Sequence, residues 1–173
     1  MTDHLTPFQP VPGVRLATAA AGIRYQGRDD VALLELPPGA RCAAVFTRNA
    51  FCAAPVVVAR RHLGSHMPRY LLINSGNANA GTGARGLTDA EASCSALADR
   101  AGCRTEEVLP FSTGVIGEQL PVDRLTAVLD GALERLRETA WPEAARAIMT
   151  TDTVPKLASR RFAVAGPTAL VSR

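Results

Sequence analysis

Four short apolar segments with β-type composition precede the first helical pattern in this sequence of 173 residues. They are residues 31–36, 41–46, 55–59 and 70–73. Short apolar runs of this kind, bounded by turn-forming residues, are typical of strands. Pro37, Pro38 and Gly39 separate the first two runs, which predicts a β-hairpin. Strands in a run, followed by helices, predict a layered α+β fold and not strict βαβ alternation.

Three helices are expected in the second half of the chain. The first begins at Thr88, because Thr88 and Glu91 have the spacing of a capping box, and it ends at Gly102, a residue suited to a left-handed cap. The second begins at Pro121 and continues through Leu136, with apolar residues at helical spacing. The third covers residues 142–149.

Further strands are expected between and around these helices. Residues 14–17, 22–25 and 108–111 are short apolar candidates. Residues 161–164 and 169–171 are joined by a Gly-Pro turn, which predicts a second hairpin.

Composition and charge exclude several classes of protein. Nineteen basic and sixteen acidic side chains leave a net charge of +3, too small for a nucleic-acid or anionic-lipid footprint. The apolar runs are far shorter than the ~20 residues of a membrane span, and the first nine residues lack a secretory signal, so we expect a cytoplasmic protein without a membrane partner. A chain of this length is expected to form a single domain that buries roughly 70% of its surface.

The cysteines and histidines do not predict a metal site. The separations of Cys42, Cys52, Cys94 and Cys103 match no zinc or redox pattern, and we interpret all four as reduced packing residues. His62 and His66 are four residues apart, but Gly64 and Pro68 interrupt a helix there, so we expect a solvated basic turn.

Three polar segments follow apolar elements and are candidates for a functional site. In residues 74–83, asparagines can donate and accept hydrogen bonds, and glycines let backbone amides approach a ligand. In residues 112–118, the Thr113 hydroxyl and the Gly114 amide could donate to one oxygen, as the stabilisation of a tetrahedral acyl-transfer intermediate requires. Residues 150–156 combine hydroxyls, a carboxylate and an ammonium group that could recognise an amino acid. Each segment could equally be a surface loop, a turn or a helix cap.

Two features limit these interpretations. No Ser-His-Asp set or Cys-His pair provides a nucleophile with its base. The spacing of Gly81, Gly83 and Gly86 matches a dinucleotide-binding fingerprint, but seven residues separate Ile73 from Gly81, whereas a true fingerprint follows its strand directly. A dinucleotide- or phosphate-binding domain that uses Gly81 to Gly86 is therefore the alternative.

Taken together, four motifs in order resemble the bifunctional ornithine acetyltransferase / glutamate N-acetyltransferase (ArgJ) family of arginine biosynthesis. They are Ala-Ala-Pro-Val at residues 53–56, Asn-Ser-Gly-Asn-Ala-Asn-Ala at 74–80, Ser-Thr-Gly-Val-Ile-Gly-Glu at 112–118, and Ala-Ile-Met-Thr-Thr-Asp-Thr at 147–153 with Pro-Lys following at 155–156. The resemblance covers about residues 13–161.

The resemblance implies a layered α/β/β/α sandwich and an acyltransferase that moves an acetyl group from N-acetylornithine to glutamate. Acetyl-CoA is a possible second donor, and no other cofactor or metal is implied. By resemblance, Thr113 and Gly114 form the oxyanion hole, and Thr150 contacts substrate. The chemistry of the first loop adds Asn77 and Asn79 as further candidates for substrate binding.

The sequence also departs from the family pattern. Members carry a Lys-Gly-x-Gly-Met segment and an Asn-Met-Ala-Thr cleavage site, whose threonine becomes the nucleophile, and neither motif occurs here. We therefore expect residues 1–173 to form a single, incomplete domain resembling the N-terminal α-chain, without a nucleophile and inactive alone. Its expected partner is a β-chain or C-terminal half, in a hetero-oligomer of α and β chains. A non-catalytic assembly subunit is the remaining alternative.

Overall fold

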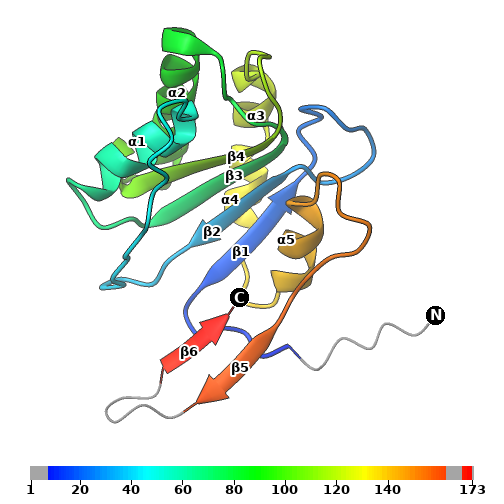
Figure 1. The fold of residues 1–173 in the computed structure, drawn as a ribbon. Helices are drawn as coiled ribbons and strands as arrows, with labels where there is room; N and C mark the ends of the chain where they lie inside the picture. The colour runs from blue at the N-terminus through cyan, green and yellow to red at the C-terminus, as the bar shows by residue number, and fades with distance from the viewer. Residues whose placement is uncertain (1–7, 163–168, 173) are drawn as a thin grey trace.

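The computed structural model describes residues 8–162 and 169–172, which form two sheets and a set of helices (Figure 1). The strands are β1 (Arg15–Ala19), β2 (Val31–Glu35), β3 (Tyr70–Asn77), β4 (Val108–Val115), β5 (Ser159–Phe162) and β6 (Ala169–Ser172). The helices are α1 (Ala54–Leu63), α2 (Gly83–Ala101), the 3₁₀ helix η1 (Thr105–Glu107), α3 (Val122–Ala127), α4 (Leu129–Glu134) and α5 (Trp141–Ala147). None of the described helices combines the length and apolar composition that a membrane crossing requires.

The larger sheet has the strand order β1-β2-β3-β4. β1 and β2 are antiparallel, as are β2 and β3, but β3 and β4 run parallel. A parallel pair needs a crossover connection, and α2 provides it. β5 and β6 form a separate antiparallel pair, which lies below the larger sheet in Figure 1.

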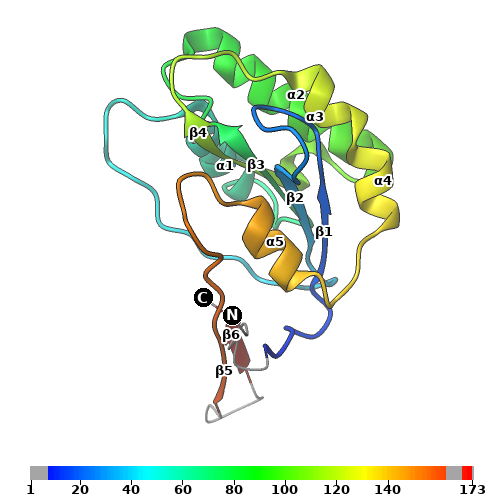
Figure 2. The same cartoon turned by 90° about the vertical axis from the view of Figure 1, so that its right-hand side faces the viewer.

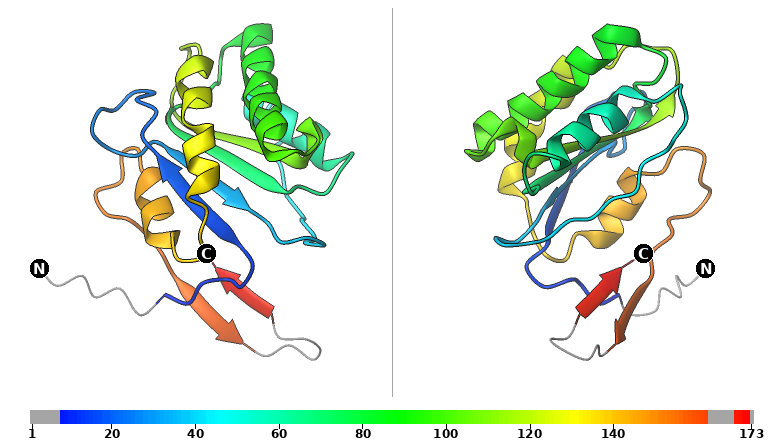
Figure 3. Two further views of the ribbon diagram at one scale, coloured as in Figure 1. Left: turned by 180° about the vertical axis from the view of Figure 1, so that it is seen from behind. Right: turned by 60° about the vertical axis from the view of Figure 1, so that its left-hand side comes forward.

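Helices cover the two faces of the larger sheet unequally (Figures 2 and 3). One face packs against α1 to α4 through a core that includes Val58, Leu97 and Leu129, each fully buried. On the opposite face, α5 packs over β1 and β2, where Leu16 and Ala32 meet its alanines. Ala140, Ala144 and Ala147 are buried in this contact with the sheet.

The structure bears out most of the predicted strands. The segments expected at 14–17, 31–36, 70–73 and 108–111 are β1 to β4, with β3 and β4 each extending four residues further than predicted. The last hairpin is present as β5 and β6, with β5 beginning two residues earlier than predicted. Residues 163–168, which hold the end of the first predicted strand and the predicted turn at 165–168, lie outside the described residues.

Three predicted strands are wrong, each for a physical reason. Residues 22–25 form a loop, because the buried Asp30 carboxylate accepts the backbone N–H groups of Ala21 and Ile23 at 2.7 and 2.6 Å. Residues 41–46 do not pair with β2, because β1 and β3 already occupy both edges of β2. Residues 55–59 lie in α1.

The helix α1 shows how packing overrides β-propensity. Its buried residues Pro55, Val58, Ala59 and His62 recur at helical spacing, and Pro55 stands in the first turn, where its missing N–H group costs nothing. The run of valines at 56–58 concealed this period, because only one of them, Val58, is fully buried. His62 is 2% exposed, so the prediction of a solvated basic turn is wrong for this residue.

The predicted helix boundaries also need correction. α2 begins at Gly83, and Thr88 lies inside it, where its hydroxyl donates to the carbonyl of Ala84 at 3.3 Å, so no capping box forms. The predicted end at Gly102 is confirmed, with φ +63°. The helix expected from Pro121 is divided at Val128 into α3 and α4. The third helix is α5, slightly shorter than predicted.

Candidate functional site

The first two polar segments lie side by side at the carboxyl ends of β3 and β4. The strands extend into both segments, so that Ser75 stands opposite Thr113 and Gly76 opposite Gly114. Backbone hydrogen bonds continue the contact beyond the strands, from Ala78 N–H to the Val115 carbonyl at 2.8 Å. The two segments therefore form one local structure.

Thr113 and Gly114 are both exposed at this end of the sheet. Gly114 has φ +134°, and a Cβ atom there would lie 2.3 Å from the carbonyl carbon of Gly76. Gly76 has φ +133°, and a Cβ atom added there would lie 3.0 Å from the Cβ atom of Arg24. The close approach of the two strands therefore requires glycine at position 114, and the left-handed φ with the contact to Arg24 favours glycine at position 76.

The third polar segment joins this site through Ser75. Its hydroxyl donates to the carbonyl of Ala147, the last residue of α5, and Arg28 holds the next turn by donating to the Met149 carbonyl. Because Ser75 is also the strand partner of Thr113, the chain that leaves α5 toward Thr150 starts beside the Thr113 end of β4. Thr150 itself is half-buried.

Charges within the third segment pair with each other. Lys156 forms an ion pair with Asp152, and this hydrogen-bonded ammonium lowers the pKa of the Asp152 carboxyl. Both side chains are exposed at the surface. The segment therefore carries a neutral ion pair and exposed threonine hydroxyls at the surface.

Asn77 and Asn79 are buried, and their amides are engaged within the protein. Asn77 Nδ2 donates to the carbonyls of Glu118 and Gln119 at 3.2 and 3.1 Å, and its Oδ1 accepts the N–H of Asn79 at 2.7 Å. Asn79, at φ +45°, donates to the Gly86 carbonyl at 2.8 Å and accepts the Thr82 hydroxyl at 2.7 Å. These contacts favour a role in holding the loops behind Thr113 and Gly114 over direct contact with substrate.

The glycine-rich turn is closer to a dinucleotide fingerprint in topology than the sequence indicated. β3 continues to Asn77, and β3, α2 and β4 form a βαβ unit. The space around Gly81 and Gly86 is occupied, however, whereas a Cβ atom added at Gly83 would have nothing within 4 Å. A Cβ atom at Gly86 would lie 1.9 Å from Thr82 Oγ1, and one at Gly81 would lie 3.2 Å from Phe51 Cζ and 3.6 Å from Ile116 Cγ2. Gly81 thus lies against apolar side chains, where a phosphate would need polar partners. Gly86 lies against Thr82 and Asn79, which are hydrogen-bonded to each other, so Gly81 and Gly86 serve packing.

His62 is buried where α1, α2 and the start of β4 meet. Its Nδ1 donates to the Val108 carbonyl at 2.8 Å, and its Nε2 lies 3.3 Å from both carboxylate oxygens of Glu91, which also binds Arg61. The donor is assigned to Nδ1 because a carbonyl oxygen can only accept. His62 thus joins α1, α2 and β4. Within the described residues, no group of three metal-ligating side chains occurs.

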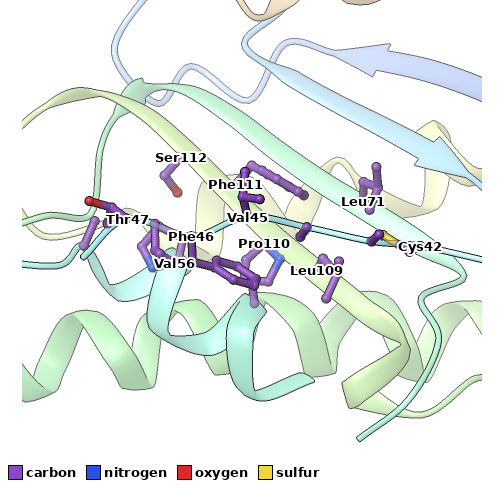
Figure 4. Close-up of a pocket in the computed structure, with 15 residues that line it drawn as sticks. Cys42, Val45, Phe46, Thr47, Val56, Leu71, Leu109, Pro110, Phe111 and Ser112 are labelled. Atoms are coloured by element: carbon purple, nitrogen blue, oxygen red, sulfur yellow. The ribbon is translucent and has the colours of Figure 1, made fainter. Parts of the chain in front are cut away.

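A pocket of about 540 Å³ opens beside the site (Figure 4). It lies between residues 42–47, the first turns of α1, and β3 and β4, with Leu71, Leu109 and Phe111 from the strands in its wall. Ser112 lies at one end of the lining, next to Thr113. The sequence did not predict this pocket, because residues 41–46 were interpreted as half of a hairpin with 31–36 and residues 55–59 as a buried strand.

The fold and the paired strand ends define an α+β domain of the ornithine acetyltransferase type. The family model described as "ArgJ family" matches residues 15–172, and the chain belongs to this family. The predicted family and fold class are thereby confirmed.

Similar proteins of full length carry the name of the same family. The arginine biosynthesis bifunctional protein ArgJ of Methylococcus capsulatus is 62% identical over 163 residues, which are 94% of this chain and 40% of that protein. The ArgJ protein of Psychrobacter arcticus is 52% identical over 157 residues, 91% of this chain and 39% of its own length. The chain thus spans about 40% of the length of these curated relatives.

Solved structures share the fold. The ArgJ crystal structure from Bacillus halodurans has a TM-score of 0.86 and 32% identity, with 93% of this chain and 84% of that chain covered. Ornithine acetyltransferase from Mycobacterium tuberculosis, solved in complex with ornithine, has a TM-score of 0.81 and 35% identity, with 94% of each chain covered. In contrast to the curated relatives, these crystallised chains are nearly matched in full.

Proposed function

We propose that this chain is the N-terminal part of a glutamate N-acetyltransferase / ornithine acetyltransferase and supplies its oxyanion hole. The observation that carries the proposal is the exposed Thr113-Gly114 pair at the end of β4, held by the backbone of Gly76. A hydroxyl and an amide on a rigid strand end are preorganised donors, and such donors stabilise developing negative charge without reorganisation.

The proposed reaction proceeds in two acyl-transfer steps. A nucleophile from the part of the protein absent here attacks the acetyl carbonyl of N-acetylornithine, and Thr113 and Gly114 donate to the oxygen that becomes negative. The carbon–nitrogen bond then breaks, and ornithine leaves after its amine takes up the proton from the nucleophile. In the second step the amine of glutamate attacks the acetyl carbonyl of the acetyl-enzyme, and Thr113 and Gly114 again donate to the oxygen that becomes negative. The bond between the acetyl carbon and the nucleophile then breaks, a proton from the amine returns to the nucleophile, and N-acetylglutamate leaves.

Other groups of the chain have supporting roles in this proposal. Thr150 contacts the amino-acid part of the substrate, since its segment leaves α5 beside Ser75. Asn77 and Asn79 hold the loops that carry the donors. No metal or bound cofactor takes part, and acetyl-CoA is a possible second acetyl donor.

The proposal includes a partner. The curated relatives are much longer than the matched region, and the chain lacks the family's nucleophilic threonine motif. We therefore propose one incomplete domain, inactive alone, that assembles with a β-chain or C-terminal half into a hetero-oligomer.

The test measures acetyl exchange between N-acetylornithine and glutamate. Two proteins are compared: this chain alone, and a chimera in which it is followed by the C-terminal region of the Methylococcus capsulatus relative. Only the chimera is expected to catalyse acetyl exchange. Turnover by the chain alone would contradict the proposed dependence on a partner, and a folded chimera without turnover would favour a non-catalytic assembly subunit.

The oxyanion role is tested in the same chimera with Thr113→Val. Loss of one such donor is expected to lower kcat about 10²–10³-fold with a small effect on KM. The matched control is Thr139→Val, at an exposed threonine between α4 and α5, which should leave kcat unchanged. Equal kcat values for the two variants would remove Thr113 from the proposed oxyanion hole.

A further inference from the structure

We infer that residues 41–46 form a docking strand, which pairs through its backbone with a strand from the region that the relatives carry beyond this chain. The inference rests on the two-part assembly proposed above. It names residues 41–46 as the place where the two parts of the assembly form backbone hydrogen bonds.

The backbone of this segment has no hydrogen-bond partner among the described residues. The nearest backbone bond before it is from Ala40 N–H to the Pro37 carbonyl, at 3.1 Å. After it, Arg60 donates to the Thr47 carbonyl at 2.9 Å, and Asn49 N–H donates to Thr47 Oγ1 at 3.1 Å. Between these anchors, the N–H and C=O groups of six consecutive residues make no hydrogen bond within residues 8–162 and 169–172. A row of unpaired backbone groups is a template for strand addition.

Two side chains of the segment are partly covered, and the three between them are open to solvent. Cys42 and Phe46 are half-buried, whereas Ala43 and Ala44 are exposed and Val45 is 100% exposed. The Arg60 guanidinium lies 5.2 Å from the centroid of the Phe46 ring and fixes one end of the segment against α1. Figure 4 shows the segment running beside β4 with the pocket between them. The segment is therefore anchored at its Phe46 end, while residues 43–45 stay uncovered along the pocket.

The strand that pairs with residues 41–46 cannot come from the larger sheet of this chain. β1 and β3 fill both edges of β2, and the pocket of about 540 Å³ separates the segment from β4. The curated relatives, by contrast, carry more than half of their length outside the matched region. A strand from that region would satisfy the free backbone groups and cover Val45, which is the mode of recognition known as β-augmentation.

Exposed apolar side chains near Thr113 also favour docking of a partner at this end of the sheet. Phe51 is 67% exposed and Ile116 is 64% exposed, and both lie against Gly81, at the end of the sheet that carries Thr113. Large exposed apolar side chains that cluster in this way mark interaction sites. A partner strand on residues 41–46 would thus bring its neighbouring chain close to the proposed oxyanion hole.

Hydrogen exchange tests the pairing directly. In the chain alone, the amides of residues 42–46 should exchange without protection, whereas the amides of β3 should be protected. In the chimera with the Methylococcus capsulatus C-terminal region, exchange at 42–46 should slow by at least about 100-fold, because paired amides exchange only through local opening. Protection of β3 in both proteins shows that this part of the fold is intact.

Substitutions separate backbone pairing from side-chain packing. Ala44→Pro and Val45→Pro each remove one N–H group, and adjacent N–H groups of a strand point to opposite edges. One of the two variants should therefore lose the protection of its neighbours in the chimera, whereas Val45→Thr, which keeps the N–H group and the β-branched shape, should retain it.

The outcomes distinguish this inference from the proposed function. Unprotected amides at 42–46 in a chimera with protected β3 would overturn the pairing, whether or not acetyl transfer is restored. Protection without acetyl transfer would support the pairing and contradict the catalytic proposal. Protection that arises in the chain alone and increases with its concentration would assign the segment to a second copy and would also overturn the inference.

Discussion

Single residues at the ends of β3 and β4 determine how closely the two strands approach. Gly76 and Gly114 face each other with φ values of +133° and +134°, and the amides of Asn77 and Asn79 fix the loops behind them. The sequence predicted that this stretch contains the site, because its residue types are those of ligand-binding loops. It could not predict that the asparagines are buried, since burial depends on chain segments that are distant in sequence.

Gly114→Ala should be one of the most destabilising single-methyl additions in the chain. The new Cβ atom would lie 2.3 to 2.6 Å from three backbone atoms of Gly76 and Asn77, and backbone cannot move aside without separating the strands. The matched control is Gly39→Ala, at φ +80° with open space around it, which should cost about 1–2 kcal/mol for the left-handed conformation alone. In urea denaturation, Gly114→Ala should cost at least about 2 kcal/mol more than the control. Equal losses would show that the strands are further apart than described.

Tyr70 should make stability fall at high pH. Its hydroxyl donates to Glu35 Oε1 at 2.9 Å, and burial together with this hydrogen bond raises the pKa of Tyr70 to about 12. The folded state therefore holds the phenol proton over a pH range in which the unfolded state, with a pKa of about 10, has lost it. Because the unfolded state binds fewer protons there, the free energy of unfolding decreases as pH rises from about 10 to about 12.

The Tyr70→Phe variant removes this pH dependence. Urea denaturation at pH 8 and pH 10.5 should show a smaller decrease for Tyr70→Phe than for the unmodified protein. Tyr25→Phe, which leaves Tyr70 in place, is the control and should retain the decrease. A variant that loses as much stability as the unmodified protein between these pH values would exclude Tyr70 as the cause.

Among the secondary-structure elements, the end of α2 was predicted correctly, whereas its start and the distinction between short helices and strands were not. Gly102 ends α2 as expected, because a left-handed cap depends on one residue. α1 was predicted as a strand, since Val56, Val57 and Val58 have high β-propensity and the helical period becomes visible only through His62. α1 forms because its buried stripe packs on α2 and β4, a reason that no local pattern contains.

The two glycines at helix C-caps should respond differently to alanine. Gly102 has φ +63° with no atom within 4 Å of an added Cβ, whereas Gly64, at the end of α1, has φ −71° and an added Cβ 3.3 Å from the Arg60 carbonyl. Gly102→Ala should cost about 1 kcal/mol through backbone conformation alone. Gly64→Ala should change stability by less than about 0.5 kcal/mol. Thermal and urea unfolding of both variants measure the difference, and a larger loss for Gly64→Ala would contradict the described backbone conformations.

At the scale of the whole molecule, the asymmetry of the sheet decides where chemistry can occur. α1 to α4 cover one face, but α5 covers only β1 and β2 on the other, so Phe111 stays 43% exposed and Thr113 is accessible. The sequence predicted the α+β class and the order of the motifs. It did not predict that β3 and β4 are parallel neighbours, because α2 was expected to follow a run of strands and not to connect two of them. Only this long-range pairing places Ser75, Thr113 and the end of α5 together.

The larger sheet and its helices should fold without the β5-β6 hairpin. Every described core residue lies between Val14 and Ala147, and a two-stranded hairpin is marginally stable in water on its own. Removal of residues 159–173 should therefore preserve cooperative unfolding and shift Tm by only a few degrees, as circular dichroism can measure, because a Tm shift scales with the stability lost. In the intact chain, the amides of β5 should also exchange faster than those of β3, which lies between two neighbours in the sheet. Loss of cooperative unfolding in the shortened chain would show instead that the hairpin is an integral part of the domain core.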